Sequence, residues 1–252
     1  MKYFISAIVD SQSVPQVRDV FLQATRDAGF DHAVYAGRFS LSLPPSILRG
    51  IPVTFNNLPA DLLAQSKSLY GVNRDAWVEW VLQNDGEITA TQLIAKVGAE
   101  RTPSLAMGAR HGLHAVKLLS LRKIVLHSVG AVMLIPGRDR TEDDLARLWS
   151  EKASDMWLLA RIAHMRIATL PREHAATNLT PRQREVLGWR SAGKTVNEIG
   201  TILGITAATV EKHMRLAREA LGVDTTPQAV LKAHVTDQLF HPAYHPLTLH
   251  LP

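Results

Sequence analysis

The chain of 252 residues has no cysteine, which excludes disulfide bonds, thiol nucleophiles and cysteine-based zinc sites. It also has no stretch of about 20 apolar residues, the length that a membrane-spanning helix needs. The N-terminal segment carries one lysine and a short apolar run that Asp10 interrupts, so we expect no secretory signal peptide. These absences favour a cytoplasmic protein without a membrane partner.

The motifs of common enzymes are missing as well. The sequence contains no nucleophile elbow, no metal pair and no phosphate-binding loop. His111 and His114 have neither a nucleophile nor a partner carboxylate placed with them, and the histidines of residues 241–252 are too loosely spaced to predict a metal site. We therefore expect no catalytic residue, no metal and no cofactor, and we interpret residues 241–252 as a flexible tail.

The chain does contain a dense run of helix signals in residues 179–221. Thr195 and Glu198 have the spacing of a capping box, which predicts a helix start. Gly204 suits the left-handed residue that ends such a helix, and Thr206 is the N-cap candidate of the next one. The pattern therefore predicts two helices joined by a tight glycine turn.

The second of these helices has two distinct faces. Its apolar residues recur at spacings of four, three and four and predict one buried stripe, formed by Val210, Met214, Ala217 and Leu221. The opposite face carries charged residues, namely Glu211, Lys212, Arg215 and Arg218. A charged face alone is usually only solvated. After a capped helix and a glycine turn, however, it is typical of a helix-turn-helix DNA-binding unit, and the net charge of +5 permits a nucleic-acid partner.

The sequence LTPRQREVL, then AGKTVNEIG, then LGITAATVEKHMRLAREALGV resembles the C-terminal DNA-binding domain of LuxR-type transcription regulators. The resemblance covers about a quarter of the chain, with the motifs in order and correctly spaced. One position departs from the family: Gln183 stands where a glutamate is usual, which weakens a charged contact within the domain but leaves the helices in place.

The resemblance implies roles for individual residues. The family's base-contacting positions map onto Glu211, Lys212 and Arg215, whose side chains can reach cytosine or guanine edges in the major groove. Phosphate contacts are expected from residues around the turns and helix N-termini, namely Arg182, Lys194, Thr195, Thr206 and Thr209. The last helix, about Pro227–Leu239, resembles the dimer-forming helix of the family. We therefore expect a homodimer on double-stranded DNA with a near-palindromic operator.

The N-terminal part alternates helical and β-like patterns. Strands are predicted at His32–Leu41, Ile51–Phe55, Val116–Leu121, Lys123–Leu126 and Val129–Pro136, and Pro52 confines the second to a sheet edge. Helical patterns lie at Val14–Ala28, residues 60–71, Asp75–Leu82, Leu93–Leu113 with a break near Pro103, and a long segment from Thr141 to Thr169. This order predicts an α/β sandwich, α-β-α, with a central antiparallel or mixed sheet over residues 1–170. A polar linker over residues 171–178 and an all-α helix-turn-helix domain over residues 179–240 follow.

The N-terminal part also resembles the autoinducer-binding domain of quorum-sensing LuxR-type regulators, through GFDHAVYAGRF, NNLPADLLAQ, Asp75 and ARHGL. In that family the aspartate accepts a hydrogen bond from the amide of an acyl-homoserine lactone, whereas a tryptophan and a tyrosine donate to its carbonyls. Here Leu62 and Ser66 stand at the tryptophan and tyrosine positions. The candidate ligand residues are thus Leu62, Ser66, Tyr70, Asp75 and Trp77. We expect a solo regulator whose pocket is empty, diverged or fitted to another small-molecule signal.

Several alternatives stay open. Asp75 is an N-cap candidate as well as a ligand candidate, and Trp77 is a core candidate. A two-component response regulator would need an acidic pocket and a phospho-accepting aspartate in a parallel sheet, and the N-terminal part offers neither in that order. A small-molecule enzyme with an accessory DNA-binding module is the remaining alternative, which no catalytic motif supports.

Overall fold

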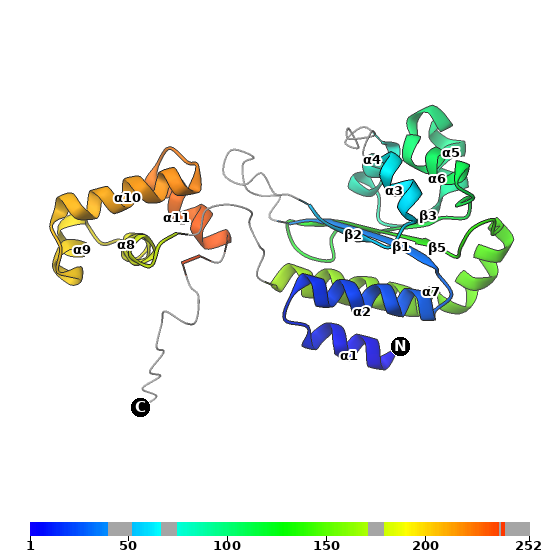
Figure 1. Ribbon diagram of the computed structural model, residues 1–252, viewed down its shortest axis with the longest axis horizontal. Coiled ribbons are helices and arrows are strands. Elements are labelled where there is room, and N and C mark those ends of the chain that lie inside the picture. The colour runs from blue at the N-terminus through cyan, green and yellow to red at the C-terminus, as the bar shows by residue number, and fades with distance from the viewer. Residues whose placement is uncertain (40–51, 67–74, 171–178, 237, 240–252) are drawn as a thin grey trace. The chain divides into compact units, whose positions relative to one another are not determined.

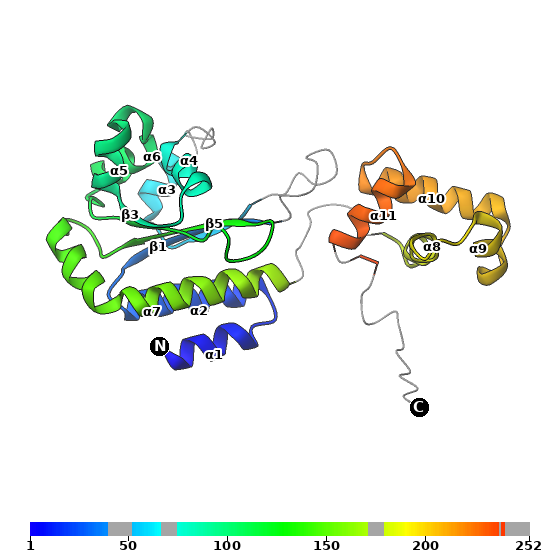
Figure 2. The same ribbon diagram turned by 180° about the vertical axis from the view of Figure 1, so that it is seen from behind.

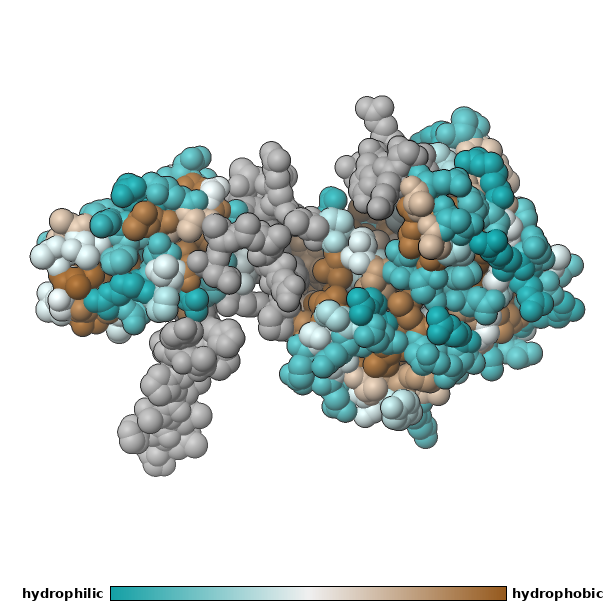
Figure 3. All heavy atoms as spheres, viewed as in Figure 1, coloured by the Kyte–Doolittle hydropathy of each residue, from teal (hydrophilic) through white to brown (hydrophobic). Residues whose placement is uncertain are grey.

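A computed structural model describes residues 1–39, 52–66, 75–170, 179–236 and 238–239. The chain forms two compact units, one with the described residues up to Leu170 and the other with those from Leu179 onward. The predicted linker and tail, residues 171–178 and 241–252, lie outside the described residues. Within these described ranges, no helix is both long enough and apolar enough to cross a membrane, and hydrophilic residues cover much of the face shown in Figure 3.

The N-terminal unit is built on a five-stranded antiparallel sheet of order β2-β1-β5-β4-β3. The strands are β1 (His32–Arg38), β2 (Val53–Asn56), β3 (Gly86–Thr89), β4 (Lys117–Ser120) and β5 (Val129–Ile135). The apolar strand β5 is central and fully buried, and its Val132 lies opposite Tyr35 of β1 and Leu119 of β4. The edge position of β2 agrees with the expectation from Pro52.

Helices cover both faces of this sheet (Figures 1 and 2). On one face lie α1 (Lys2–Asp10), α2 (Val14–Asp27) and α7 (Glu142–Thr169). On the other lie α3 (Ala60–Ser66), α4 (Ala76–Gln83), α5 (Ala90–Val97), the short 3-10 helix η3 (Ala99–Arg101) and α6 (Pro103–Arg110). The predicted α-β-α sandwich is therefore confirmed. Because strand side chains alternate between faces, Tyr35 packs in the core with α2 and α7, whereas the neighbouring Val34 packs with the α3–α6 layer.

Three local features differ from the sequence analysis or were missing from it. The segment Lys123–Leu126, predicted as a strand, forms turns between β4 and β5, and that prediction was wrong. Lys123 has φ 67° and His127 has φ 54°, conformations that do not occur in a regular strand. The helix α1 and the edge strand β3 were not predicted. By contrast, the capping box of Thr141 and Asp144 starts the 28-residue helix α7 as expected.

A polar cluster lies inside the core on the α7 side of the sheet. His164 of α7 is fully buried; its Nδ1 lies 2.8 Å from the Tyr35 hydroxyl and its Nε2 lies 3.0 Å from Ser128 Oγ. Ser128 donates its only hydroxyl hydrogen to the carbonyl of Val125, so it accepts from Nε2–H, and Nδ1 accepts from Tyr35. Burial lowers the pKa of His164 to about 4, so the imidazole is neutral at pH 7.

The C-terminal unit consists of α8 (Pro181–Ser191), α9 (Val196–Leu203), α10 (Ala207–Leu221) and α11 (Thr226–Val235). The predicted caps are present: Thr195 and Glu198 form the capping box of α9, and Gly204 ends that helix in the left-handed conformation at φ 65°. The turn is tight, since a Cβ on Gly200 would lie 2.8 Å from the carbonyl oxygen of Ile205. The predicted stripe of α10 is buried, which fixes the opposite face of that helix toward the exterior.

Candidate DNA-binding surface and ligand pocket

The outer face of α10 carries the three predicted base-reading residues. Glu211, Lys212 and Arg215 are all exposed, and their spacing puts them on one side of the helix. Arg215 Nη1 lies 2.6 Å from the carboxylate of Glu219, one turn further along. Both partners are more than half exposed, so this ion pair is weak and a better acceptor can replace it.

The predicted phosphate-contacting residues lie around the two turns, and most of them also hold the fold. Arg182 donates to the carbonyl of Leu203 at the end of α9 and pairs with Glu185. Thr206 caps α10 by accepting from the backbone N–H of Thr209, and the two hydroxyl oxygens are 2.9 Å apart. The first turn of α10 therefore presents its backbone N–H groups outward from a rigid start.

The N-terminus of α9 is also capped by a threonine, Thr195, and here Glu198 completes the capping box. Hydrogen bonds from the backbone and hydroxyl of Thr195, then from Lys194, lower the pKa of Glu198. Lys194 lies 3.4 Å from the Glu198 carboxylate and is partly exposed, so it remains a long cationic side chain at the entry of the helix. Lys194 and Thr195, the two residues predicted to contact phosphate here, therefore lie together at the N-terminus of α9.

Gln183, which departs from the family pattern, has a defined role. It is buried and completes the capping box of α8, where its Oε1 lies 2.9 Å from the backbone nitrogen of Thr180 and accepts a hydrogen bond from it. A neutral amide acceptor is therefore sufficient for this cap.

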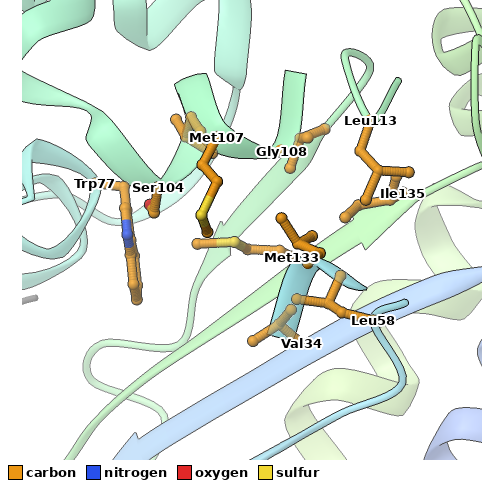
Figure 4. A pocket seen from close by; sticks show the side chains of 12 residues that line it. Val34, Leu58, Trp77, Ser104, Met107, Gly108, Leu113, Met133 and Ile135 are labelled. Carbon is orange, nitrogen blue, oxygen red and sulfur yellow. The ribbon is translucent and has the colours of Figure 1, made fainter. Parts of the chain in front are cut away.

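The second candidate site is a cavity of about 160 Å³ between the sheet and the α3–α6 layer (Figure 4). Its described lining is almost entirely apolar and carries no charged side chain; it consists of Val34, Leu58, Leu62, Trp77, Ser104, Leu105, Met107, Gly108, Leu113, Val116, Met133 and Ile135. Two of its atoms are exceptions. The indole Nε1 of Trp77 and the hydroxyl of Ser104 are buried and have no hydrogen-bond partner.

Asp75 lies beside this cavity but does not line it. Its side chain is 2% exposed and caps α4, with Oδ1 3.4 Å from the backbone nitrogen of Trp77. Its Oδ2 accepts a hydrogen bond of 3.0 Å from the backbone nitrogen of Ser104, in the first turn of α6. One carboxylate thus connects the starts of two helices, and both helices contribute side chains to the cavity.

The other predicted ligand residues do not all lie at the cavity. Leu62 lines the cavity and is buried. Ser66 is the last residue of α3, and Tyr70 lies outside the described residues. Ser104 was not predicted, because the Thr-Pro-Ser segment signals only a helix start.

Two family models match this chain. The model described as "Autoinducer binding domain" matches residues 13–167, more than half of the chain, and the model described as "Bacterial regulatory proteins, luxR family" matches residues 177–233. The chain belongs to the LuxR-type family of quorum-sensing transcription regulators. Each match falls within one of the two observed units, so this LuxR-type chain combines an autoinducer-binding domain with a helix-turn-helix domain.

Individual relatives agree with the family assignment. The transcriptional activator BjaR1 of Bradyrhizobium diazoefficiens is 39% identical over 84 residues, which are 33% of this LuxR-type chain and 35% of BjaR1. The chain therefore spans about a third of the length of that relative. The transcriptional repressor ThaA of Burkholderia thailandensis is 27% identical over 245 residues, 91% of this chain and 94% of ThaA. One of these relatives is thus a transcriptional activator and the other a transcriptional repressor.

The fold of the LuxR-type chain is that of SdiA from Escherichia coli. A crystal structure of SdiA is 19% identical, covers 95% of this chain and 98% of SdiA, and superposes with a TM-score of 0.58. A structure described as SdiA in complex with octanoyl-rac-glycerol gives 18% identity, 95% coverage of both chains and a TM-score of 0.57. At this identity the likeness shows the fold, so the chemistry of the pocket follows from the residues of this chain.

Proposed function

We propose that the protein regulates transcription by binding a near-palindromic operator as a homodimer, with α10 of each protomer in a major groove. The observation that carries this proposal is the geometry of α10. A buried stripe and a capped N-terminus fix the helix, and Glu211, Lys212 and Arg215 are left exposed on its outer side. A helix held in this way can enter the groove with its orientation already set.

The three side chains divide the reading of bases. Arg215 leaves Glu219 and donates two hydrogen bonds to guanine O6 and N7, and Lys212 reaches the same kind of acceptor. Glu211 accepts from cytosine N4. The backbone N–H groups at the starts of α9 and α10 contact phosphates, together with the side chains of Arg182, Lys194, Thr195, Thr206 and Thr209.

The helix α11 supports the dimeric part of the proposal. It starts with a capping box of Thr225 and Gln228 and buries Ala229 and Ala233 against the rest of the unit, while Leu231 remains partly exposed. We assign a dimer contact to this helix. Two protomers related by a twofold axis then read half-sites about 34 Å apart, one turn of DNA.

The N-terminal unit acts as the sensor for a small molecule, and its pocket differs from that of acyl-homoserine-lactone receptors. Leu62 cannot donate a hydrogen bond where the family has a tryptophan, and each unpaired ligand carbonyl costs about 1–3 kcal/mol. Ser66, at the family's tyrosine position, is too short to reach the other carbonyl. Losing both hydrogen bonds weakens lactone binding about a hundredfold or more. The protein is then a solo regulator in the cytoplasm without catalytic activity. The SdiA complex with octanoyl-rac-glycerol supports this direction, because that ligand is named as something other than a lactone.

A gel-shift titration with the DNA upstream of the gene tests the DNA-binding part. Arg215→Ala should weaken operator binding by about 1–3 kcal/mol and relax the preference at one base pair of each half-site. Glu219→Ala is the matched control, since it removes the partner of Arg215 without removing the base-reading group. Equal weakening of Arg215→Ala on all sequences would show that Arg215 contacts phosphate instead of a base.

A further inference from the structure

The ligand cavity contains an unusual pair of polar atoms. Three buried side-chain polar atoms of the described residues lack a hydrogen-bond partner, and two of them, Trp77 Nε1 and Ser104 Oγ, belong to residues that line this one cavity. Buried polar groups in proteins are nearly always paired, so an unpaired pair at the wall of a cavity indicates a missing partner inside it.

The wall around these atoms restricts what that partner can be. Figure 4 shows Trp77 and Ser104 at one end, the side chains of Met107 and Met133 in the middle, and aliphatic groups such as Ile135 at the other end. The described lining residues carry no charge, which disfavours a charged ligand. The volume of about 160 Å³ resembles cavities of about 150 Å³ that accept benzene, so the occupant is compact.

The donors specify the polar group of the occupant. An indole N–H can only donate, whereas a serine hydroxyl can donate or accept. A carbonyl oxygen has two lone pairs and can accept from both. Asp75 does not line the cavity, and its two oxygens accept backbone N–H groups of Trp77 and Ser104 instead.

We propose that Trp77 and Ser104 together bind the carbonyl oxygen of a compact, uncharged, mainly apolar ligand, and that Asp75 is a positioning residue that holds both of them. The proposal rests on the sensory role proposed above. It deepens that role, since the ligand needs one acceptor oxygen at the Trp77 end and no amide N–H for Asp75. The carboxylate fixes the backbone of Trp77 in α4 and of Ser104 in α6, so it sets the distance between the two donors.

A pair of isosteric probes tests the subsite in the full-length protein. Acetophenone and α-methylstyrene have nearly the same shape, but the first has C=O where the second has C=CH₂. Calorimetric titration gives the ratio of their two affinities for each protein variant. Using the ratio removes effects of a variant on the size or stability of the cavity, because both probes feel those effects equally.

Trp77→Phe keeps an aromatic ring and removes the N–H, and Ser104→Ala removes the hydroxyl. Each should lower the ratio of ketone to hydrocarbon affinity about three- to tenfold, the effect of one buried neutral hydrogen bond. Trp80→Phe is the matched control, since Trp80 lies on the same helix α4 but does not line the cavity, and its ratio should stay within about twofold of the wild type.

Asp75→Asn tests the positioning role. An amide presents an N–H₂ group to one of the two backbone N–H groups that the carboxylate accepts, so one of the two contacts is lost. We expect the affinity ratio to fall about three- to tenfold while the hydrocarbon affinity changes less than about twofold. A merely structural role would weaken both probes to the same extent, and that result would overturn the positioning assignment.

Three further results would overturn the proposed carbonyl subsite. Ratios that do not change in Trp77→Phe and Ser104→Ala overturn the subsite, and so does a wild-type protein that binds neither probe. N-octanoyl-homoserine lactone is the third probe: strong stabilisation that Trp77→Phe leaves unaltered would assign the pocket to a lactone and overturn the proposal. None of these results affects the gel shift with operator DNA, so failure of the subsite is distinguishable from failure of the proposed regulator function.

Discussion

Acidification should destabilise the N-terminal unit through a single buried residue, His164. In the unfolded chain this imidazole titrates near its ordinary pKa of 6.5, whereas in the folded unit burial lowers the pKa to about 4. Between these values the unfolded state binds more protons than the folded state. The stability contributed by neutral His164 is therefore complete above about pH 6.5 and is lost as the pH falls toward 4.

The magnitude follows from the two pKa values. At pH 5 the loss amounts to about 2 kcal/mol, and at pH 4 to about 3 kcal/mol, a substantial fraction of the 5–15 kcal/mol of a typical domain. The neighbouring groups do little to stabilise a protonated His164. Nδ1, the nitrogen that takes it up, accepts from the Tyr35 hydroxyl, and the other neighbouring oxygen belongs to Ser128. No acidic side chain hydrogen-bonds this imidazole among the described residues.

Urea unfolding followed by tryptophan fluorescence measures this effect. Four of the five tryptophans lie in the N-terminal unit, so Trp189→Phe leaves a signal from that unit alone. His164→Gln in this background keeps hydrogen-bonding capacity without a titrating ring, and its free energy of unfolding should fall much less between pH 7 and pH 4.5. If both proteins lose the same stability over this range, the desolvated histidine is not the cause and the reasoning is refuted.

Two further predictions concern local packing. Thr141→Ala removes the side-chain cap of α7 and should cost about 1 kcal/mol of N-terminal stability in urea unfolding, whereas Thr141→Ser should be nearly neutral. Gly200→Ala should destabilise the C-terminal unit and weaken operator binding, because its new Cβ would meet the carbonyl of Ile205 at 2.8 Å. Gly188→Ala, also within a helix but with nothing within 4 Å of the added Cβ, should stabilise the same unit by about 0.5–1 kcal/mol in a thermal melt; destabilisation there would contradict the steric explanation.

The C-terminal helices could be predicted because their signals are local. Thr195 with Glu198, and Thr206 with Thr209, are capping pairs within one turn, and Gly204 marks the single left-handed position between the helices. Such interactions depend only on residues three or four positions apart, so the sequence displays them directly. The exposed face of α10 then follows from the buried stripe without further information.

The N-terminal unit was harder to predict where contacts between residues far apart in the sequence determine the secondary structure. The helix α1 has no side-chain cap at Met1, and β3 has only four residues, so neither produces a strong local pattern. The residues Lys123–Leu126 have β-like side chains, but the antiparallel pairing of Ser120 with Ala131 turns the chain between them. The hydroxyl of Ser104 is unpaired because no neighbouring residue in the fold offers it a hydrogen bond, and a sequence motif does not contain that information.

For Asp75, the family resemblance and the structure indicate different roles. The resemblance implies a carboxylate that meets the ligand. In this chain the carboxylate is buried between two backbone N–H groups, and among the described lining residues Trp77 and Ser104 bring unpaired polar atoms to the cavity. An aspartate that connects α4 to α6 is needed whatever occupies the cavity, because losing it would leave the N–H groups of two partly buried helix starts without their acceptor. The apolar lining residues cap no helix, so Leu62, which we propose stands in place of a hydrogen-bond donor, changes the cavity wall without removing a helix cap. Ligand chemistry in this fold can therefore change through the lining alone while the frame that holds it stays the same.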